Sequence, residues 1–597
     1  MKKSKSVSLC MIVKNEEKHL ERCLNSVKGL VDEIIIVDTG SIDNTKKIAE
    51  KFGAIIKDYE WDNNFSNARN YSLEFAKMEW ILLLDGDDEF NSEYKKQYID
   101  LINNSAKDGH YFKTLSFTGD IINKDNVVSN LNLRLLKNNN KYKFVGAIHE
   151  QIRCLDGTMD YRNFASEDIE IFHYGYLTEV AIEKEKRKRN IAIIEEELKR
   201  DPTNQFHIFN LANEYFALND LNKTLELFDK VYKNLNPNTG YSSKLVIRRI
   251  MCLDELNRYN DALNAIQEGL KMYPEFTDLE FIRGLIHLKG RRYTLAIKSF
   301  EKCVEMGMAP IQLEFIRGAG TFRPHMALGG IYYKFEDYQN SLSSYEKALQ
   351  FNPTLKSPVY KIGSILNKVY DDKKFVSYNL SKYFSLDYEP NLLMISDILM
   401  NEGLYDMASG YLEKAKDTNK ENKVIDLQIG KCLFYQKKYS DALEIFKKLE
   451  ENNEIAVECK KFLFIINLIS HFNNLGLSEL KIDENKDFVI DRIYGQFHNI
   501  LIGNNEVLLL EKDDHEKILH ISLDLLGELL KVNEFYLFEK LINILNLIES
   551  KNILLELAKL YKRHGFNSMA AQEVIRSIQE FGVVDVQGAE ILYSETN

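Results

Sequence analysis

The sequence predicts an α/β domain with a mostly parallel, doubly wound sheet, followed by a long all-helical solenoid. Two observations in the first part of the chain indicate the sheet. Short apolar runs alternate there with segments of helical periodicity, and one run, Trp80–Leu84, leads directly into Asp85-Gly86-Asp87-Asp88. From about residue 201, small residues recur at intervals of 12 and 34 positions. That recurrence is typical of stacked helical hairpins.

Length and composition restrict the class of protein. The chain has 597 residues, more than one hydrophobic core usually serves. Its net charge of −12 argues against a general nucleic-acid binder, which would carry a basic surface. The seven cysteines are scattered and never spaced Cys-x-x-Cys, which is typical of reduced thiols. The first apolar run, Val7–Val13, ends in charged residues without a cleavage site, so we expect a cytoplasmic protein.

The elements of the first 84 residues follow the order of a parallel sheet. Apolar runs predict strands, and apolar residues that recur every three or four positions predict helices. We expect strands at Val7–Val13, Glu33–Val37, Ala54–Asp58 and Trp80–Leu84, and helices from Asn15 to Val27, from Asp43 to Phe52 and from Phe65 to Met78. The carboxyl ends of such strands share one edge of the sheet, where ligands bind.

Beyond the acidic cluster the pattern changes to that of antiparallel strands. We expect these strands at Tyr111–Ile122, Leu131–Lys137, Lys141–Ile152 and Ile169–Tyr176. This half of the domain would receive the second substrate, although the pattern alone does not identify it.

The acidic cluster after Trp80–Leu84 predicts a site for a metal and a nucleotide. A buried strand that ends in Asp85-Gly86-Asp87 delivers two carboxylates to the edge of the sheet. Carboxylates crowded there repel one another unless a cation lies between them. Asp-Gly-Asp is also common in turns, where it serves backbone geometry. The strand before it is what favours the site.

Six motifs occur within residues 6–178. They are Met11–Glu17, Val37–Thr45, Trp61–Asn70 with its Ala68-Arg69-Asn70, Leu84–Asp88, Leu133–Leu136 and Gly146–Gln151. In this order they resemble the family 2 glycosyltransferases of GT-A (Rossmann-like) fold, in particular the bacterial branch that includes peptide and protein glycosyltransferases. The resemblance implies transfer of a sugar from a nucleotide sugar.

The resemblance also implies roles in binding the donor. Asp38 would accept the imide N–H of uracil, although it could instead cap the following helix. Backbone groups at Asn15 and Glu16 would hold the base, although these residues are also ordinary at a helix start. Arg69 would contact the diphosphate with its planar fork, whereas a lone arginine on a helix is usually solvated.

For the metal and the base, the resemblance implies a second set of residues. Asp85 would contact the ribose or the metal, and Asp87 would ligate Mn²⁺ or Mg²⁺ between the two phosphates of a UDP-sugar. His173 is expected as a further metal ligand in competition with His149, although a lone histidine on a strand is more often structural. Glu150 is expected to activate the acceptor hydroxyl, against the alternative of a surface salt bridge.

The remainder of the chain has the period and the small residues of tetratricopeptide repeats. Small residues twelve positions apart are Gly284/Ala296, Gly329/Ser341, Ser396/Ala408, Gly430/Ala442 and Ala558/Ala570. Phe300, Tyr345 and Phe446 follow four residues later and would fill the gap between neighbouring helices. We expect a catalytic domain at 1–180, a linker helix at 181–200, repeats at 201–465 with an insertion at Glu305–Arg317, and a helical capping region at 466–597.

Together these features predict a metal-dependent inverting glycosyltransferase. It would move a sugar such as GlcNAc or glucose from a UDP-sugar to Ser or Thr of a protein or peptide that the repeats present. The alternatives are a lipid or polysaccharide acceptor, bacteriocin-type S-glycosylation, and use of the repeats for homo-oligomerisation or docking. A non-enzymatic adaptor is disfavoured, because it would be expected to lose Asp38, Arg69 and Asp85 first.

Overall fold

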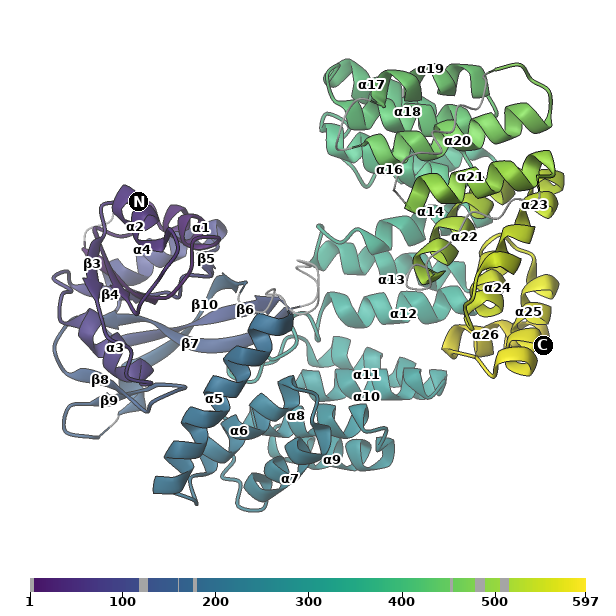
Figure 1. The fold of residues 1–597 in the computed structure, drawn as a ribbon. Helices are drawn as coiled ribbons and strands as arrows, with labels where there is room; N and C mark the ends of the chain where they lie inside the picture. The colour runs from purple at the N-terminus through teal and green to yellow at the C-terminus, as the bar shows by residue number, and fades with distance from the viewer. Residues whose placement is uncertain are drawn as a thin grey trace. The chain divides into compact units, whose positions relative to one another are not determined.

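A computed structural model describes residues 5–117, 127–158, 160–174, 180–450, 455–477, 489–504 and 515–596. The chain divides into two compact units, Met1–Pro358 and Val359–Asn597. The first unit therefore contains the sheet together with the first helical hairpins (Figure 1).

Eight strands form one mixed sheet in the order β3-β2-β1-β4-β7-β6-β10-β5. Their bounds are β1 Val7–Val13, β2 Glu33–Asp38, β3 Ile55–Asp58, β4 Trp80–Leu83, β5 Asp88–Phe90, β6 Gly109–Phe117, β7 Val127–Lys137 and β10 Phe164–His173. Strands β1 to β4 are parallel, with Leu9 beside Ile34 on one side and Leu82 on the other. Strand β7 runs antiparallel to both β4 and β6. The predicted α/β class is confirmed.

The central strand β1 is apolar at nearly every position because helices cover both faces of the sheet (Figure 1). Leu9 and Met11 belong to the core cluster that contains Leu24, whereas Cys10 points to the opposite face and packs with Ile35. The helices of this domain are α1 Leu20–Ser26, α2 Thr45–Lys51, α3 Phe65–Leu73 and α4 Lys95–Asn104.

Three predicted elements differ clearly in the structure, and one of them, the helix expected from Asn15, begins only at Leu20. The helix expected from Phe65 to Met78 ends at Leu73. The side-chain amide of Asn138 donates to the carbonyl groups of Ala76 and Met78, which holds the following segment in turns.

The strand expected over Lys141–Ile152 is instead a hairpin of two strands, β8 Tyr142–Val145 and β9 Gln151–Cys154. Gly146 (φ 97°) and His149 (φ 53°) interrupt it with left-handed backbone. The predicted ends of two other strands, at residues 118–122 and 175–176, lie outside the described residues.

The first unit continues as helical hairpins. Their bounds are α5 Val180–Arg200, α6 Gln205–Ala217, α7 Leu221–Tyr232, α8 Ser242–Glu255, α9 Tyr259–Met272, α10 Thr277–Lys289, α11 Tyr293–Met306, α12 Phe322–Lys334, α13 Tyr338–Phe351 and α14 Ser357–Val369, which crosses into the second unit. The insertion predicted at Glu305–Arg317 lies against the sheet. There Ile316 forms an antiparallel bridge with Val128 of β7, and the carboxylate of Glu314 is 2.5 Å from Lys113 Nζ of β6. The insertion therefore attaches the hairpins to the sheet domain.

The predicted pairing of small and aromatic residues explains how three of the hairpins close. A Cβ built on the glycine of the first helix would meet the ring on the second helix at a distance that real carbon atoms do not adopt. The pairs are Gly284 with Phe300 (2.5 Å), Gly329 with Tyr345 (2.9 Å) and Gly430 with Phe446 (2.8 Å). The missing side chain lets the two helices approach, so the ring fills the space between them.

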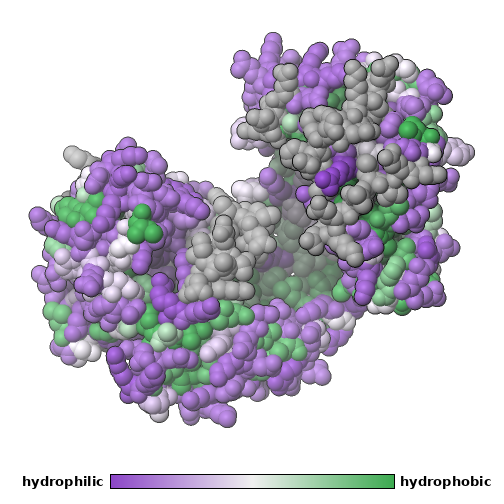
Figure 2. Space-filling view, in the orientation of Figure 1, coloured by the Kyte–Doolittle hydropathy of each residue, from purple (hydrophilic) through white to green (hydrophobic). Residues whose placement is uncertain are grey.

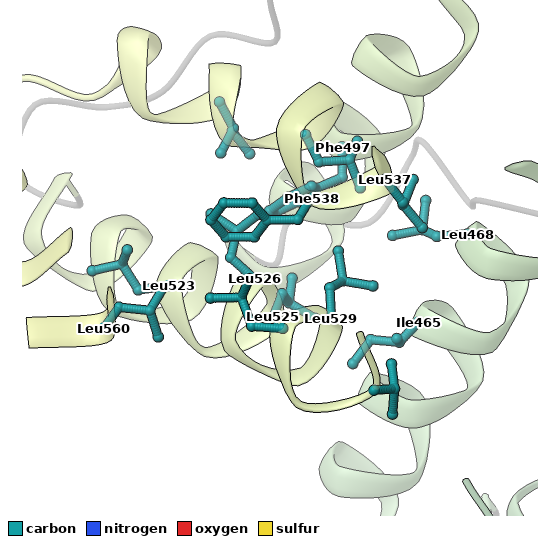
Figure 3. Close-up of a cluster of buried hydrophobic side chains, with 14 of the residues drawn as sticks. Ile465, Leu468, Phe497, Leu523, Leu525, Leu526, Leu529, Leu537, Phe538 and Leu560 are labelled. Carbon is teal, nitrogen blue, oxygen red and sulfur yellow. The ribbon is translucent and has the colours of Figure 1, made fainter. Parts of the chain in front are cut away.

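The second unit is all-helical. Its helices are α15 Lys373–Ser381, α16 Glu389–Asn401, α17 Tyr405–Thr418, α18 Lys423–Tyr435, α19 Tyr439–Leu449, α20 Ala456–Phe472, α21 Val489–Ile502, α22 His515–Lys531, α23 Phe535–Leu541, α24 Ile553–Arg563, α25 Asn567–Phe581 and α26 Val586–Thr596. Figure 3 shows side chains of its core, where Ile465 of α20, Phe497 of α21, Leu526 of α22 and Phe538 of α23 meet. The apolar side chains of α20 are therefore buried in this core.

None of the helices that the structure describes is long and apolar enough to cross a membrane. The face drawn in Figure 2 is mostly hydrophilic, with hydrophobic side chains in smaller patches.

A fragment that ends at Arg200 is expected to be less stable than one that ends at Pro358. Ile148, in the loop between β8 and β9, is 4% exposed and packs with Ile194 of α5 and Ile208 of α6. Removing α6 exposes the apolar side chains of this cluster, and burial of each one stabilises the folded state by about 1.5–3 kcal/mol. We expect the melting temperature of fragment 1–200, measured by circular dichroism, to lie roughly 5 °C or more below that of fragment 1–358. Equal melting temperatures would show that the stability of the sheet domain does not depend on the helical hairpins.

Candidate active site

The acidic motif lies where β4 ends at the carboxyl edge of the sheet. The side chain of Glu16, from the turn after β1, packs on Gly86: a Cβ at Gly86 would lie 2.7 Å from Glu16 Cγ. Glycine at the centre of the motif therefore makes room for a third acidic side chain. Burial and then repulsion from Asp87 raise the pKa of Glu16 to about 8.

Two arginines hold Asp85: the buried Arg134 and the partly buried Arg69. Nη2 of Arg69 is 3.3 Å from Asp85 Oδ1, and Nη1 of Arg134 is 3.3 Å from Asp85 Oδ2. Nε of Arg69 also donates to Glu150 Oε1 at 3.0 Å. Burial by itself would raise the pKa of Asp85, but Arg134 and Arg69 outweigh it and hold that pKa below its usual value. Arg69 thus connects the acidic motif to the predicted base.

Arg134 received no role from the sequence, although its motif Leu133–Leu136 was recognised. It is 3% exposed, and its Nη1 lies 2.9 Å from Asp88 Oδ2 in addition to its contact with Asp85. The sequence did contain a signal for this role: Arg134 lies in an apolar strand, and a buried charge needs a partner of opposite charge.

Asp87, Asp88 and His173 offer ligand atoms that all lie within 4.8 Å of one another. Strands β5 and β10 pair antiparallel and set His173 opposite Asp88. Nδ1 of His173 is 2.9 Å from Asp88 Oδ1 and 3.4 Å from Asp87 Oδ1. Burial raises the pKa of Asp87, and Asp88 and Asp85 raise it further against the opposing effect of His173. Carboxylates and an imidazole that crowd together in this way fit Mn²⁺ or Mg²⁺.

The two other candidates for the metal site lie differently. Asp85 is outside this group of three, and its two oxygens face Arg69 and Arg134. His149 Nε2 is 3.6 Å from Glu214 Oε1 of α6. The structure therefore places His173, and not His149, beside the acidic residues.

Asp38 ends β2 and is 1% exposed. Its Oδ1 accepts the backbone N–H groups of Gly40 (2.9 Å) and Ser41 (2.8 Å). Its Oδ2 is buried and has no hydrogen-bond partner within the described part of the chain. A buried acceptor without a donor is costly, so this oxygen suits a ligand N–H group. Asp38 does not cap α2, since the N–H of Thr45 donates to Asp43 Oδ1 instead (2.9 Å).

Asn15 and Glu16 connect the loops after β1 and β2. Asn15 has φ 56°, and its Oδ1 accepts the N–H of Ile42 at 2.9 Å. The N-cap of α1 is His19, so the helix expected from Asn15 begins only at Leu20. The N–H of Glu16 donates to Thr45 Oγ1 at 2.7 Å. These bonds align the turn that faces the carboxyl edge.

Comparisons with known proteins match both parts of the chain. The model "Glycosyl transferase family 2" matches residues 8–158, and two "Tetratricopeptide repeat" models match residues 253–308 and 322–355. The SPbeta prophage-derived glycosyltransferase SunS of Bacillus subtilis (strain 168) is 29% identical over 294 residues, which cover 47% of this chain and 67% of that protein. An uncharacterized glycosyltransferase of Rickettsia bellii (strain RML369-C) is 36% identical over 94 residues, or 16% of this chain and 32% of that protein.

Among solved structures, glucosyl-3-phosphoglycerate synthase from Mycobacterium tuberculosis, in complex with Mn²⁺, UDP and phosphoglyceric acid, is 20% identical. The match covers 19% of this chain and 45% of that chain, with a TM-score of 0.17.

Proposed function

Because this chain carries a family 2 glycosyltransferase domain followed by tetratricopeptide repeats, we propose that it transfers a sugar from a UDP-sugar to a protein or peptide. The group of Asp87, Asp88 and His173 at the carboxyl edge of the sheet supports this proposal most directly. It concentrates metal ligands where an α/β sheet binds nucleotides.

On the donor side, Asp87 and His173 would hold Mn²⁺ or Mg²⁺. When bound, the cation would neutralise the diphosphate of the departing UDP. Asp38 would accept the imide N–H of uracil through its free Oδ2. We assign Asp85 to the ribose, because arginines already contact both of its oxygens.

Arg69 has a different proposed role from the diphosphate contact that its motif implied. Its side chain is 13% exposed, and its guanidinium contacts Asp85 and Glu150. A fork that is used in this way orients two carboxylates. We propose that Arg69 fixes the positions of Asp85, which would bind the ribose, and Glu150, which would act as the base, relative to each other.

On the acceptor side, Glu150 would accept the proton of the hydroxyl that attacks the sugar carbon as the bond to UDP breaks. A single displacement of this kind inverts the configuration at that carbon. The repeats support a protein or peptide acceptor, because solenoids offer an extended binding surface. Ser or Thr is the proposed attachment site. A Cys acceptor, a lipid or polysaccharide acceptor and a role of the repeats in oligomerisation remain the competing outcomes.

The donor half of the proposal is tested by UDP release. The purified full-length chain, given UDP-GlcNAc or UDP-glucose with Mn²⁺ or Mg²⁺, is expected to release UDP, and excess chelator is expected to stop it. Asp38→Asn should raise KM for the donor about tenfold or more, since a buried hydrogen bond to the base is lost. Asp58→Asn is the matched control, because Asp58 ends the neighbouring strand β3 with its side chain 77% exposed.

Two results would contradict the donor assignment: no UDP release from any donor, or an unchanged KM in Asp38→Asn. The acceptor half is tested by intact-mass analysis of candidate proteins co-expressed with this chain. A mass increase of one sugar on a Ser or Thr peptide is expected. Label found only on Cys, or only in a lipid fraction, would select the corresponding alternative.

A further inference from the structure

Glu214 of α6, in the first helical hairpin, is a buried carboxylate that faces the catalytic domain. It is 1% exposed. Its Oε2 accepts from Arg187 Nη1 at 3.0 Å, and its Oε1 accepts from Asn190 Nδ2 at 3.2 Å and lies 3.6 Å from His149 Nε2. Burial would raise the pKa of Glu214, but His149 and Arg187 outweigh it and lower that pKa. The repeats therefore supply a charged group to the loop that precedes Glu150.

The β8–β9 loop, residues 146–150, is also held from the opposite side by α3. The N–H of Phe65 donates to Ala147 O at 2.8 Å, and Ser66 Oγ donates to Gly146 O at 2.6 Å. Within this loop His149 has φ 53°, a conformation that persists only where surrounding contacts support it. Contacts from both α3 and α6 thus hold this loop, whose last residue, Glu150, lies directly before β9.

We propose that Glu214 is a positioning residue: it holds His149 and thereby sets Glu150 against Arg69 and the acceptor. This inference rests on the proposed role of Glu150 as base. It makes the first repeat hairpin part of the catalytic apparatus, in addition to any role in presenting an acceptor. The physical reason is that general-base catalysis falls steeply when the base moves by about 1 Å.

Glu214→Gln in the full-length chain tests the proposal. Glutamine keeps the size and the acceptor oxygen of the side chain but removes its charge. We expect kcat for sugar transfer to fall about 10- to 100-fold, while KM for the UDP-sugar stays within about twofold. Glu226→Gln, at an exposed position of the neighbouring α7, should leave both unchanged. Loss of melting temperature with an unchanged kcat in Glu214→Gln would overturn the positioning role.

A double variant separates positioning from general stability. If Glu214 acts through Glu150, Glu150→Gln and the Glu150→Gln/Glu214→Gln double variant should have the same kcat. Independent, multiplicative losses would contradict the proposal. If the wild-type chain transfers no sugar, the proposed function fails first, and this outcome is distinguishable because it precedes any comparison of variants.

Discussion

Asp87→Asn is expected to reduce metal-dependent UDP release at least 10²- to 10³-fold, the range found when one group that stabilises developing charge is removed. Asp87 lies 3.4 Å from His173 Nδ1 in the group of three metal-ligand candidates. Without its carboxylate the site loses a ligand for the cation that would neutralise the leaving UDP. Initial rates of UDP release with saturating Mn²⁺ measure the effect.

Thermal unfolding provides a readout of the same variant that does not depend on activity. A cation that binds only the folded chain raises the melting temperature, so Mn²⁺ should stabilise the wild type and not Asp87→Asn. Without metal the variant should be no less stable than the wild type, because burial and then Asp88 already disfavour the charged form of Asp87. Asp156→Asn, on an exposed turn, is the control. Equal stabilisation of Asp87→Asn and wild type by Mn²⁺ would remove Asp87 from the metal site.

Arg69→Met is expected to destabilise the chain by about 1–3 kcal/mol, because Glu150 loses its hydrogen-bonded partner while Asp85 keeps Arg134. Arg69 is 3.0 Å from Glu150 and 3.3 Å from Asp85. Methionine fills similar space but provides no donor. Denaturant unfolding of the catalytic domain measures the loss, and UDP release should fall with it because Asp85 and Glu150 lose their common orientation.

Two controls accompany Arg69→Met. Arg69→Lys keeps the charge but not the fork, so it should recover only part of the stability. Arg162→Met removes an arginine whose side chain is 91% exposed and paired with Asp160, and an exposed pair of this kind contributes little to stability. If Arg69→Met and Arg162→Met cost the same, the connection between Asp85 and Glu150 is not a structural one.

Much of the fold was predictable because its signals are local. Val7–Val13 is apolar at nearly every position, which indicates a strand covered on both faces, and it lies inside the sheet between β2 and β4. The repeats were predictable for a similar reason: a glycine and an aromatic ring sixteen residues apart, as in Gly284 and Phe300, must meet within one hairpin. The position of Asp85 at the carboxyl edge of the sheet was predictable because Asp85 comes just after the end of a strand.

The remainder of the site depends on which distant segments become neighbours. Glu150 was expected at the end of one long strand, but left-handed residues such as His149 make a hairpin whose loop is held from two sides. Arg134 reaches the acidic motif only because β7 pairs with β4 in antiparallel register. Such pairings join residues far apart in the sequence, so the local periodicity of the sequence does not predict them.

The amino-acid sequence by itself therefore determined the α/β domain, the helical repeats and the acidic edge of the sheet, because hydrophobic periodicity and strand ends act over a few residues. Only the tertiary structure decided that His173 lies beside Asp87 and Asp88, that Arg69 joins Asp85 to Glu150, and that Glu214 of the first repeat faces the catalytic loop. These contacts arise because strand order and hairpin packing bring charged side chains together. Once they are buried, such side chains are stable only when they are paired.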